Sequence, residues 1–581
     1  MNTSTSAKVD FSTFGLEPLR SDEHDPVSPV ERLRRLAALE QGDVAVIVVY
    51  AIAVGLVSLA VPIAAQSIVN TVAFTALLQP VLVLSILVFL GLITAGILRT
   101  LQYKVIETLQ QRLFVRMAYD SVRRLTKANI RGFGDGSAAP ELMNRFFEVA
   151  TIQKAASTLL LDGLSVVLQG GVSLLLLAFY HPALLAFDVV LMALIAFMIF
   201  GLGRNGVSTA IKESKAKYAT AAWLEEMAGA LRTFKSRESQ EFATMRADEL
   251  AKAYVLARGK HFKILVRQIV ASYILQAIAT AGLLGLGGFL VIKGQLTLGQ
   301  LVAAELIVTA VLVNVAKFGK YLESYYDLVA SVDKVGNIVD LPSEREEGAS
   351  HARVEGPARV ELIDVEFSYG STPALRDISI DIAPGAQLAI LGSDASGKST
   401  LVDILYGLRA PSQGQVKFDG IDVRTLALSD LRRDVALVGK AEIFDASVID
   451  NLCLGRPDVD ATTIANALEC VGLSEEIGNL SEGTLTKLGP SGCRLTTSQA
   501  ARLTIARGIV AKPRLLIVDE ALDRLGTETA IKVLHGIARN ADSTTVLVLT
   551  SRQEIAEAVG TLRRLDKGTL FSDVRSREVS L

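Results

Sequence analysis

Six separate apolar segments, each long enough to cross a lipid bilayer, constrain the fold of this chain most strongly. A spanning helix needs about 20 consecutive, mostly apolar residues. The segments cover residues 44–66, 80–101, 157–180, 183–203, 268–292 and 297–320. Hydrophobic residues make up 50% of the chain, and the mean hydropathy of +0.40 is high for a water-soluble protein. The sequence therefore predicts an all-α membrane domain of six transmembrane helices.

The charges of the connecting segments predict how these helices are oriented. Lys and Arg concentrate on the cytosolic side of a membrane protein. The connections at 102–156 and 204–267 are rich in both residue types, whereas the other three contain only Lys293. The first forty residues resemble no signal peptide, and the stretch near 28–41 is amphipathic, as in an elbow helix on a membrane surface. We expect a multi-pass protein of the inner (cytoplasmic) membrane with both termini in the cytosol.

The second half of the chain has a different character. From about Arg359 the pattern changes to short strands and helices separated by glycine turns, which is typical of a soluble α/β domain. The predicted divisions are a cytosolic N-terminal segment (1–43), the six-helix domain (44–330), a linker (331–358) and the α/β domain (359–581). The net charge of -2 does not indicate a nucleic-acid partner. The three cysteines have no CxxC spacing, which argues against a zinc site or a disulfide framework.

A glycine-rich loop marks a phosphate-binding site in the α/β domain. The motif is complete and reads Gly392-Ser393-Asp394-Ala395-Ser396-Gly397-Lys398-Ser399-Thr400. A strand pattern precedes it and a helical pattern follows it, which is the context that a P-loop requires, and a chance glycine turn is the alternative. Backbone N–H groups of such a loop wrap nucleotide phosphates. We expect Lys398 to contact the β- and γ-phosphates and Ser399 to bind Mg²⁺.

Two carboxylates follow a later apolar strand. The sequence Leu-Leu-Ile-Val leads directly into Asp519 and Glu520. We expect Asp519 to hold Mg²⁺ and Glu520 to act as the catalytic residue that orients or deprotonates the attacking water. The alternative is that both carboxylates simply begin a solvated loop.

With these motifs in place, the whole chain resembles half-size exporters of the ATP-binding-cassette (ABC) family. The resemblance implies a six-helix exporter domain followed by a cytosolic α/β P-loop nucleotide-binding domain, with ATP and Mg²⁺ as cofactors. Tyr369 matches the aromatic residue that stacks on adenine in this family, although a core aromatic is the alternative. The stretch 62–72 is similar to the bacterial bacteriocin and haemolysin exporters. Too few residues precede the first span for the peptidase domain that some of them carry, so we expect none.

Four stretches depart from the pattern of this family. Lys440 stands where a glutamine is usual, and a cation cannot ligate Mg²⁺. Gly526 replaces an aspartate, and Ser551 replaces the switch histidine. The signature sequence, LSGGQ in most members, reads Leu495-Thr496-Thr497-Ser498-Gln499. By resemblance the last four residues contact nucleotide, and Thr496 keeps the hydroxyl that meets the γ-phosphate. We expect ATP hydrolysis to be slow or atypical.

The resemblance also implies a dimer, because one chain supplies only half of each ATP site. The altered signature and the altered switch lie on the same chain, so a heterodimer would have a defect in both sites. We therefore favour a homodimer, with a heterodimer as the alternative. The segments 140–144 and 225–229 match the tips that couple the two domains, and ordinary exposed turns are the alternative.

Two functions fit the sequence. The first is ATP-driven export of a peptide, protein or amphipathic molecule by alternating access, with a periplasmic adaptor as an optional partner. The second is an ATP-binding regulatory or scaffold membrane protein that hydrolyses ATP poorly. The retained Glu520 favours the first function, whereas Lys440 and Ser551 favour the second. No motif identifies the substrate.

Overall fold

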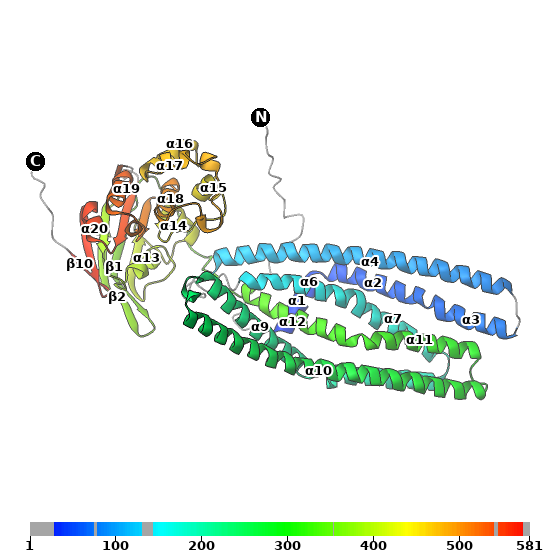
Figure 1. Ribbon diagram of the computed structural model, residues 1–581. Helices are drawn as coiled ribbons and strands as arrows, with labels where there is room; N and C mark the ends of the chain where they lie inside the picture. The colour runs from blue at the N-terminus through cyan, green and yellow to red at the C-terminus, as the bar shows by residue number, and fades with distance from the viewer. Residues whose placement is uncertain (1–27, 75–77, 130–142, 353, 540–543, 573–581) are drawn as a thin grey trace, which may run out of the picture. The chain divides into compact units, whose positions relative to one another are not determined.

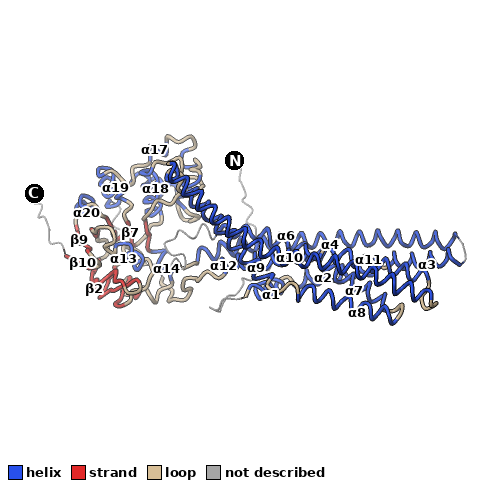
Figure 2. Tube along the Cα trace, turned by 60° about the horizontal axis from the view of Figure 1, so that its bottom comes forward, coloured by secondary structure: helices blue, strands red, loops and turns tan. Residues whose placement is uncertain are grey.

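The computed structural model describes residues 28–74, 78–129, 143–352, 354–539 and 544–572. The chain divides into two compact units, Met1–Ser343 and Glu344–Leu581. In the described part of the chain the first unit is built of long helices, and the strands of the two sheets lie in the second unit (Figure 2).

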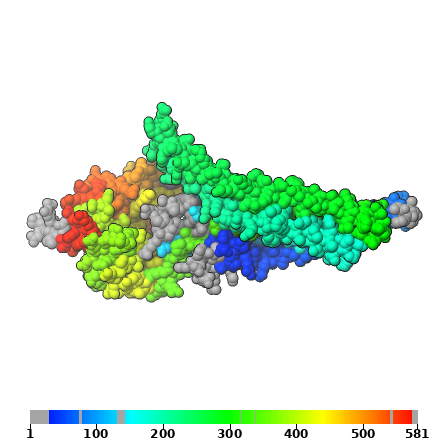
Figure 3. Space-filling view, turned by 90° about the horizontal axis from the view of Figure 1, so that it is seen from below, coloured from blue at the N-terminus to red at the C-terminus, as the bar shows by residue number. Residues whose placement is uncertain are grey.

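The first unit contains six helices that are long and apolar enough to span a membrane, as the sequence predicts. The spans are Gln41–Val72, Leu78–Lys127, Arg145–Ala178, Pro182–Gly229, Arg237–Ile292 and Leu298–Gly336. They comprise α2 (Gln41–Ser58), α3 (Ala60–Phe74), α4 (Leu78–Lys127), α6 (Glu148–Thr158), α7 (Leu164–Ala178), α8 (Pro182–Ala196), α9 (Gly206–Gly229), α10 (Arg237–Ile292), α11 (Leu298–Ala316) and α12 (Phe318–Val339). The predicted amphipathic stretch forms α1 (Pro29–Leu39), capped by the side chain of Ser28. The helices run side by side (Figure 1), and Figure 3 shows α9 and α10 in green along one face.

The outer faces of this bundle are apolar. In the most apolar 18-residue window of α4 no residue is buried inside the protein, and large hydrophobic side chains such as Leu87, Phe89 and Leu90 are more than half exposed. An exposed apolar surface of this length would be unfavourable in water, so lipid is the medium that suits it.

The first span is interrupted near its middle. Helix α2 ends at Ser58 and α3 begins at Ala60. Pro62 has no N–H to donate to the carbonyl of Ser58, and its ring crowds the preceding turn, which explains a break at this point.

A buried carboxylate joins three of the long helices. Glu148 on α6 is 5% exposed. It accepts hydrogen bonds from Lys217 Nζ at 2.8 Å and Tyr218 OH at 2.8 Å, both on α9, and from Ser331 Oγ at 2.6 Å on α12. Both carboxylate oxygens accept hydrogen bonds, so the buried negative charge is compensated. The same hydrogen bonds hold α6, α9 and α12 together.

The second unit is an α/β domain with two sheets, as predicted. One is antiparallel with strand order β2-β1-β4-β5, and the other is largely parallel with order β10-β9-β3-β8-β7-β6. The strands are β1 (Val360–Tyr369), β2 (Thr372–Ile382), β3 (Gln387–Leu391), β4 (Gln413–Phe418), β5 (Ile421–Asp422), β6 (Val435–Val438), β7 (Leu515–Asp519), β8 (Thr545–Thr550), β9 (Thr561–Asp566) and β10 (Thr569–Ser572). The helices are α13 (Lys398–Leu405), α14 (Leu428–Asp434), α15 (Val448–Cys453), α16 (Ala461–Cys470), α17 (Ser474–Gly478), α18 (Thr497–Val510), α19 (Thr527–Arg539) and α20 (Gln553–Val559).

The parallel strands decide where the site lies. Strands β3, β8 and β7 are adjacent and are nearly continuous apolar runs, because both faces of the sheet are covered. Ligands of such sheets bind at the carboxyl ends of the strands. The phosphate loop follows β3, Ser551 follows β8, and Glu520 follows β7, so all three lie at the carboxyl-terminal ends of the parallel strands.

Replacing Glu148 with alanine tests the buried carboxylate. We expect Glu148→Ala to lower the free energy of unfolding by about 2–3 kcal/mol, because it removes the acceptor of the buried Ser331 hydroxyl together with two further hydrogen bonds between helices. Thermal unfolding of the purified protein in nanodiscs measures this. The control is Glu249→Ala, which removes an exposed pair with Arg246 at 3.0 Å and should change stability by less than about 1 kcal/mol. Equal melting temperatures for the two variants would contradict the role of Glu148.

Candidate functional site

The phosphate loop is shaped by the backbone between β3 and α13. Gly397 has a φ of 107°, in the region that favours glycine. A Cβ on Gly397 would lie 2.7 Å from the carbonyl oxygen of Ala374, so a side chain has no room there. Ala395 also has a positive φ, of 60°. The loop therefore turns sharply and leads into the N-terminus of α13, where N–H groups remain free for an anion.

Lys398 is held inside this loop. Its side chain is 4% exposed, and its Nζ donates hydrogen bonds to the carbonyls of Gly392 at 2.6 Å and Ser393 at 2.8 Å. The same Nζ lies 3.2 Å from Glu520 Oε1. The structure thus brings the predicted phosphate-binding lysine and the predicted catalytic carboxylate together.

The two carboxylates after the strand differ in environment. Burial and the neighbouring Glu520 raise the pKa of Asp519 to about 6, and its Oδ1 is buried without a hydrogen-bond partner. Glu520 has a left-handed backbone, with φ of 54°, and its side chain is 42% exposed. Asp519 is therefore partly buried with one buried, unpartnered oxygen, whereas the Glu520 carboxylate is accessible to water.

These residues fit a magnesium–nucleotide complex. The free oxygen of Asp519 and the exposed hydroxyl of Ser399, in the first turn of α13, are oxygen ligands of the kind that Mg²⁺ prefers. In the described part of the chain no cluster of three or more His, Cys, Asp or Glu side chains is arranged as a metal site. A Mg²⁺ ion here would take most of its ligands from phosphate and water, as it commonly does.

Ser551, at the switch position, is engaged by a residue that the sequence analysis missed. The backbone N–H and the hydroxyl of Ser551 both donate to Asp523 Oδ2 at 2.8 Å, and Thr550 donates to Asp523 Oδ1. Asp523 thereby ties the loop after β7 to the end of β8. No local motif signals this contact, because its partners are distant in sequence.

Two further departures from the family pattern lie at the same sheet edge or beside it. Gly439 follows β6, and a Cβ on it would be 3.7 Å from the carbonyl oxygen of Asp519, so the exposed Lys440 next to it lies near the site. Gly526 immediately precedes α19, and a Cβ added to it would have no atom within 4 Å.

Tyr369 is the last residue of β1 and is 47% exposed. Its hydroxyl is 3.2 Å from Thr400 Oγ1, at the end of the phosphate loop. The nearby Phe367, which is 8% exposed, fills the core instead. The structure therefore places Tyr369 as an accessible aromatic ring beside the loop, and the alternative of a core aromatic does not describe it.

In the described part of the chain no hydrogen bond or ion pair joins the four signature residues to the phosphate loop. Thr496 caps α18 and forms a capping box with Gln499, whose side chain also donates to Glu476 at 2.7 Å. Thr497 and Ser498 form the first turn of α18, which packs against α15, α16 and β6. The Thr496 oxygen accepts from the Gln499 N–H, which leaves its own hydrogen free to donate elsewhere.

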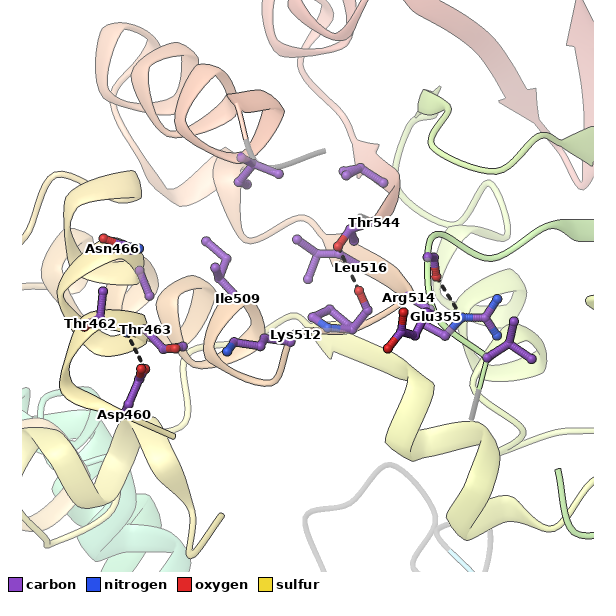
Figure 4. A pocket seen from close by; sticks show the side chains of 16 residues that line it. Glu355, Asp460, Thr462, Thr463, Asn466, Ile509, Lys512, Arg514, Leu516 and Thr544 are labelled. Carbon is purple, nitrogen blue, oxygen red and sulfur yellow. Dashed lines mark hydrogen bonds between the residues drawn. The ribbon is translucent and has the colours of Figure 1, made fainter. Parts of the chain in front are cut away.

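A separate pocket lies at the amino-terminal ends of β7 and β8, opposite the phosphate loop (Figure 4). It has a volume of about 780 Å³ and lies beside Arg514 and Thr544, which precede β7 and β8. Two of its polar side chains form hydrogen bonds within the protein: Asp460 accepts from the Thr463 N–H at 2.8 Å, and Arg514 Nε donates to the Gly356 carbonyl at 2.8 Å. It shares no residue with the phosphate site.

Asp519→Asn tests the buried carboxyl in nucleotide-free, magnesium-free protein. Because the folded-state pKa of Asp519 lies above its ordinary value of 3.8, its contribution to stability is present at low pH and lost as pH rises through about 6. Asparagine stays neutral, so we expect the variant to be more stable than the wild type at pH 8, by at most about 3 kcal/mol, and the gain to shrink at pH 5. Thermal unfolding measures both, with the exposed Asp458→Asn as control. A gain that is equal at both pH values would contradict the assignment.

Two family models match this chain. A model described as "ABC transporter transmembrane region" matches residues 44–315, and one described as "ABC transporter" matches residues 375–523. The first range contains most of the membrane-spanning helices, and the second contains the phosphate loop, the signature stretch and both carboxylates.

Curated relatives and a solved structure agree with these matches. The leukotoxin export ATP-binding protein LtxB of Aggregatibacter actinomycetemcomitans is 29% identical over 62% of this chain and 51% of its own length. The α-hemolysin translocation ATP-binding protein HlyB of Escherichia coli is 28% identical over 62% and 51%. The mycobactin import ATP-binding/permease protein IrtB of Mycolicibacterium smegmatis is 26% identical over 58% and 60%. The chain thus spans about half the length of the curated relatives it matches.

The fold is shared with a bacterial Atm1-family ABC exporter solved with ATP bound. The TM-score is 0.80, with 21% identity, over 92% of this chain and 96% of that one. Taken with the two matched models, this likeness leads to one conclusion: the chain belongs to the ABC transporter family and has the fold of an exporter half-transporter.

Proposed function

We propose that this chain is one half of an ATP-driven exporter of the cytoplasmic membrane, with both termini in the cytosol. It moves a peptide, protein or amphipathic molecule out of the cell by alternating access. The observation that carries the proposal is the position of Lys398, in a complete phosphate loop and 3.2 Å from Glu520, on a chain that also has six spans. One relative is named as an export protein for a leukotoxin and another as a translocation protein for α-hemolysin, which supports export as the direction of transport.

The residues of this chain have distinct tasks in that reaction. Bound Mg²⁺–ATP supplies the reactive γ-phosphoryl group. The loop carbonyls hold Lys398 in place, so its ammonium is already positioned for the phosphates. Ser399 and Asp519 supply the oxygens suited to Mg²⁺. The Glu520 side chain is 42% exposed, with Oε1 3.2 Å from Lys398 Nζ, so its carboxylate is placed to accept a proton from water.

The proposed assembly is a homodimer. Within one chain, Thr496–Gln499 and the phosphate loop are separate, and α18 keeps an N-terminus and a free hydroxyl hydrogen. In a head-to-tail dimer each signature faces the phosphate loop of the partner, so two identical sites form. ATP would then bind more tightly to the closed dimer than to the open one, because only the closed dimer places both segments on the nucleotide. This difference in affinity is what allows ATP to drive the conformational change of transport.

The coupling segments are proposed from the tips of two helices. Asn144 Nδ2 donates to Glu225 Oε2 at 2.6 Å, which joins the two predicted stretches. Residues 140–142 of the first stretch lie outside the described residues. Because the two tips are linked, a force applied to one is transmitted to the other.

A second function, ATP binding with poor hydrolysis in a regulatory protein, is favoured by one contact. The Ser551 hydroxyl already donates to Asp523, so its hydrogen is not available to a γ-phosphate. A switch histidine would supply that donor. We therefore propose slow ATP hydrolysis for both functions. A measured ATPase rate distinguishes them, because an exporter must complete repeated cycles of hydrolysis whereas a regulator need not.

The exporter proposal is tested with Glu520→Gln in nanodiscs. We expect ATPase activity to fall at least about 100-fold, because the base is lost. With ATP and Mg²⁺ the variant, expressed alone, should form a stable dimer that holds two ATP molecules, as measured by native mass spectrometry. Lys398→Ala is the control and should not retain ATP. Unchanged turnover in Glu520→Gln, or a chain that assembles only with a different half-transporter, would contradict the proposal.

Restoring the switch residue tests the cause of slow hydrolysis. We expect Ser551→His to raise the ATPase rate several-fold, because an imidazole N–H can reach a phosphate oxygen while Asp523 holds the loop. Phosphate release measures the rate, with Ser551→Ala as the matched variant that supplies no donor. Equal rates for the histidine and alanine variants would place the slow step at another residue.

A further inference from the structure

The ring of Tyr369 is fixed by three contacts. Its hydroxyl is 3.2 Å from Thr400 Oγ1. The ring of Phe367 meets it edge to face, at 5.1 Å between centroids and 82° between planes. The guanidinium carbon of Arg409 lies over the ring, 4.8 Å from its centroid. Despite these contacts Tyr369 remains 47% exposed, so nearly half of the residue stays accessible to a ligand.

Arg409 is itself held in place. Its Nε donates to Asp403 Oδ2 at 2.7 Å, and its backbone N–H donates to the Asp403 carbonyl at 3.1 Å. The guanidinium also lies 5.7 Å from the Phe367 centroid. Asp403 is on α13, the helix that begins with Lys398. The position of Arg409 is therefore set by the same helix that carries the phosphate site.

We propose that Arg409 is a positioning residue of the nucleotide-base site: it covers one face of Tyr369 and fixes the plane of the ring, so that the base of a nucleoside triphosphate stacks on the other face. The proposal rests on the proposed function, because it needs a nucleotide in the phosphate loop. A planar guanidinium stacks on an aromatic face, whereas an ammonium does not do so in the same way. A ring already held at three points loses little freedom when a base stacks on it.

Neutralisation of Asp403 is the competing role for Arg409. Asp403 is one of the carboxylates whose charge raises the pKa of Asp519, so an unpaired Asp403 would disfavour the phosphates. A lysine at position 409 keeps the positive charge and removes the planar group. Arg409→Lys therefore separates stacking from charge.

The test compares two ligands in the presence of Mg²⁺, using the full chain in nanodiscs and isothermal titration. ATP contains the base, whereas inorganic tripolyphosphate contains only the phosphates. We expect Arg409→Lys to weaken ATP binding about two- to fivefold, the range of a cation–π contact at a partly exposed site, and to leave tripolyphosphate binding unchanged. In the Tyr369→Ala background, Arg409→Lys should have no further effect on ATP. Arg424→Lys, at a surface arginine paired with Asp422, is the control and should change neither ligand.

Each other outcome is decisive. Wild-type ATP affinity in Arg409→Lys, or an equal loss for ATP and tripolyphosphate, overturns the inference. An additive loss in the double variant with Tyr369→Ala also overturns it, since Arg409 would then act independently of the ring. If the wild-type protein binds ATP no better than Lys398→Ala does, the proposed function itself fails, and that result is distinct from the others.

Discussion

A hydrocarbon layer offers no hydrogen-bond partner to a peptide group, and this constraint determines most of the first unit. Each span must satisfy its N–H and C=O groups internally, so the spans are built almost entirely of helix, and the break in the first span is confined to the single residue between α2 and α3. The 50 residues of α4 and the 56 of α10 are far more than the layer requires. The excess is polar, and there the helices need interactions of another kind, such as the buried Glu148 with its three donors.

The second unit satisfies its backbone differently, and its site follows from that difference. Parallel strands place their carboxyl ends on the same side of the sheet, so the phosphate loop, Glu520 and Ser551 all follow strands at that side although they are distant in sequence. Two neighbouring carboxylates, Asp519 and Glu520, lie here beside one ammonium group, that of Lys398. Asp519 has a buried oxygen without a hydrogen-bond partner, and the Lys398 ammonium donates to carbonyls of its own loop. Such a site is prepared for a ligand that supplies both anionic oxygens and a cation.

The sequence predicted the six spans, the α/β domain and the phosphate loop because each depends on residues that are close along the chain. Apolar run length and the order of glycine, lysine and hydroxyl residues are local signals. The contacts of Asp523 with Ser551 and of Arg409 with Tyr369 were missed, because a different strand or helix carries each partner. The roles of the individual site residues and the boundaries of the predicted linker stay predictions, although α12 extends into that linker as far as Val339.

The length of α10 has a mechanical consequence. With 56 residues in one uninterrupted helix, it is about 84 Å long at 1.5 Å per residue. A tilt of only about 5° around one end therefore displaces the other end by about 7 Å. A helix of this kind acts as a lever, so a small rotation within the membrane becomes a movement larger than a side chain outside it. A small change of tilt at one end of α10 therefore moves the residues at its other end by several ångströms.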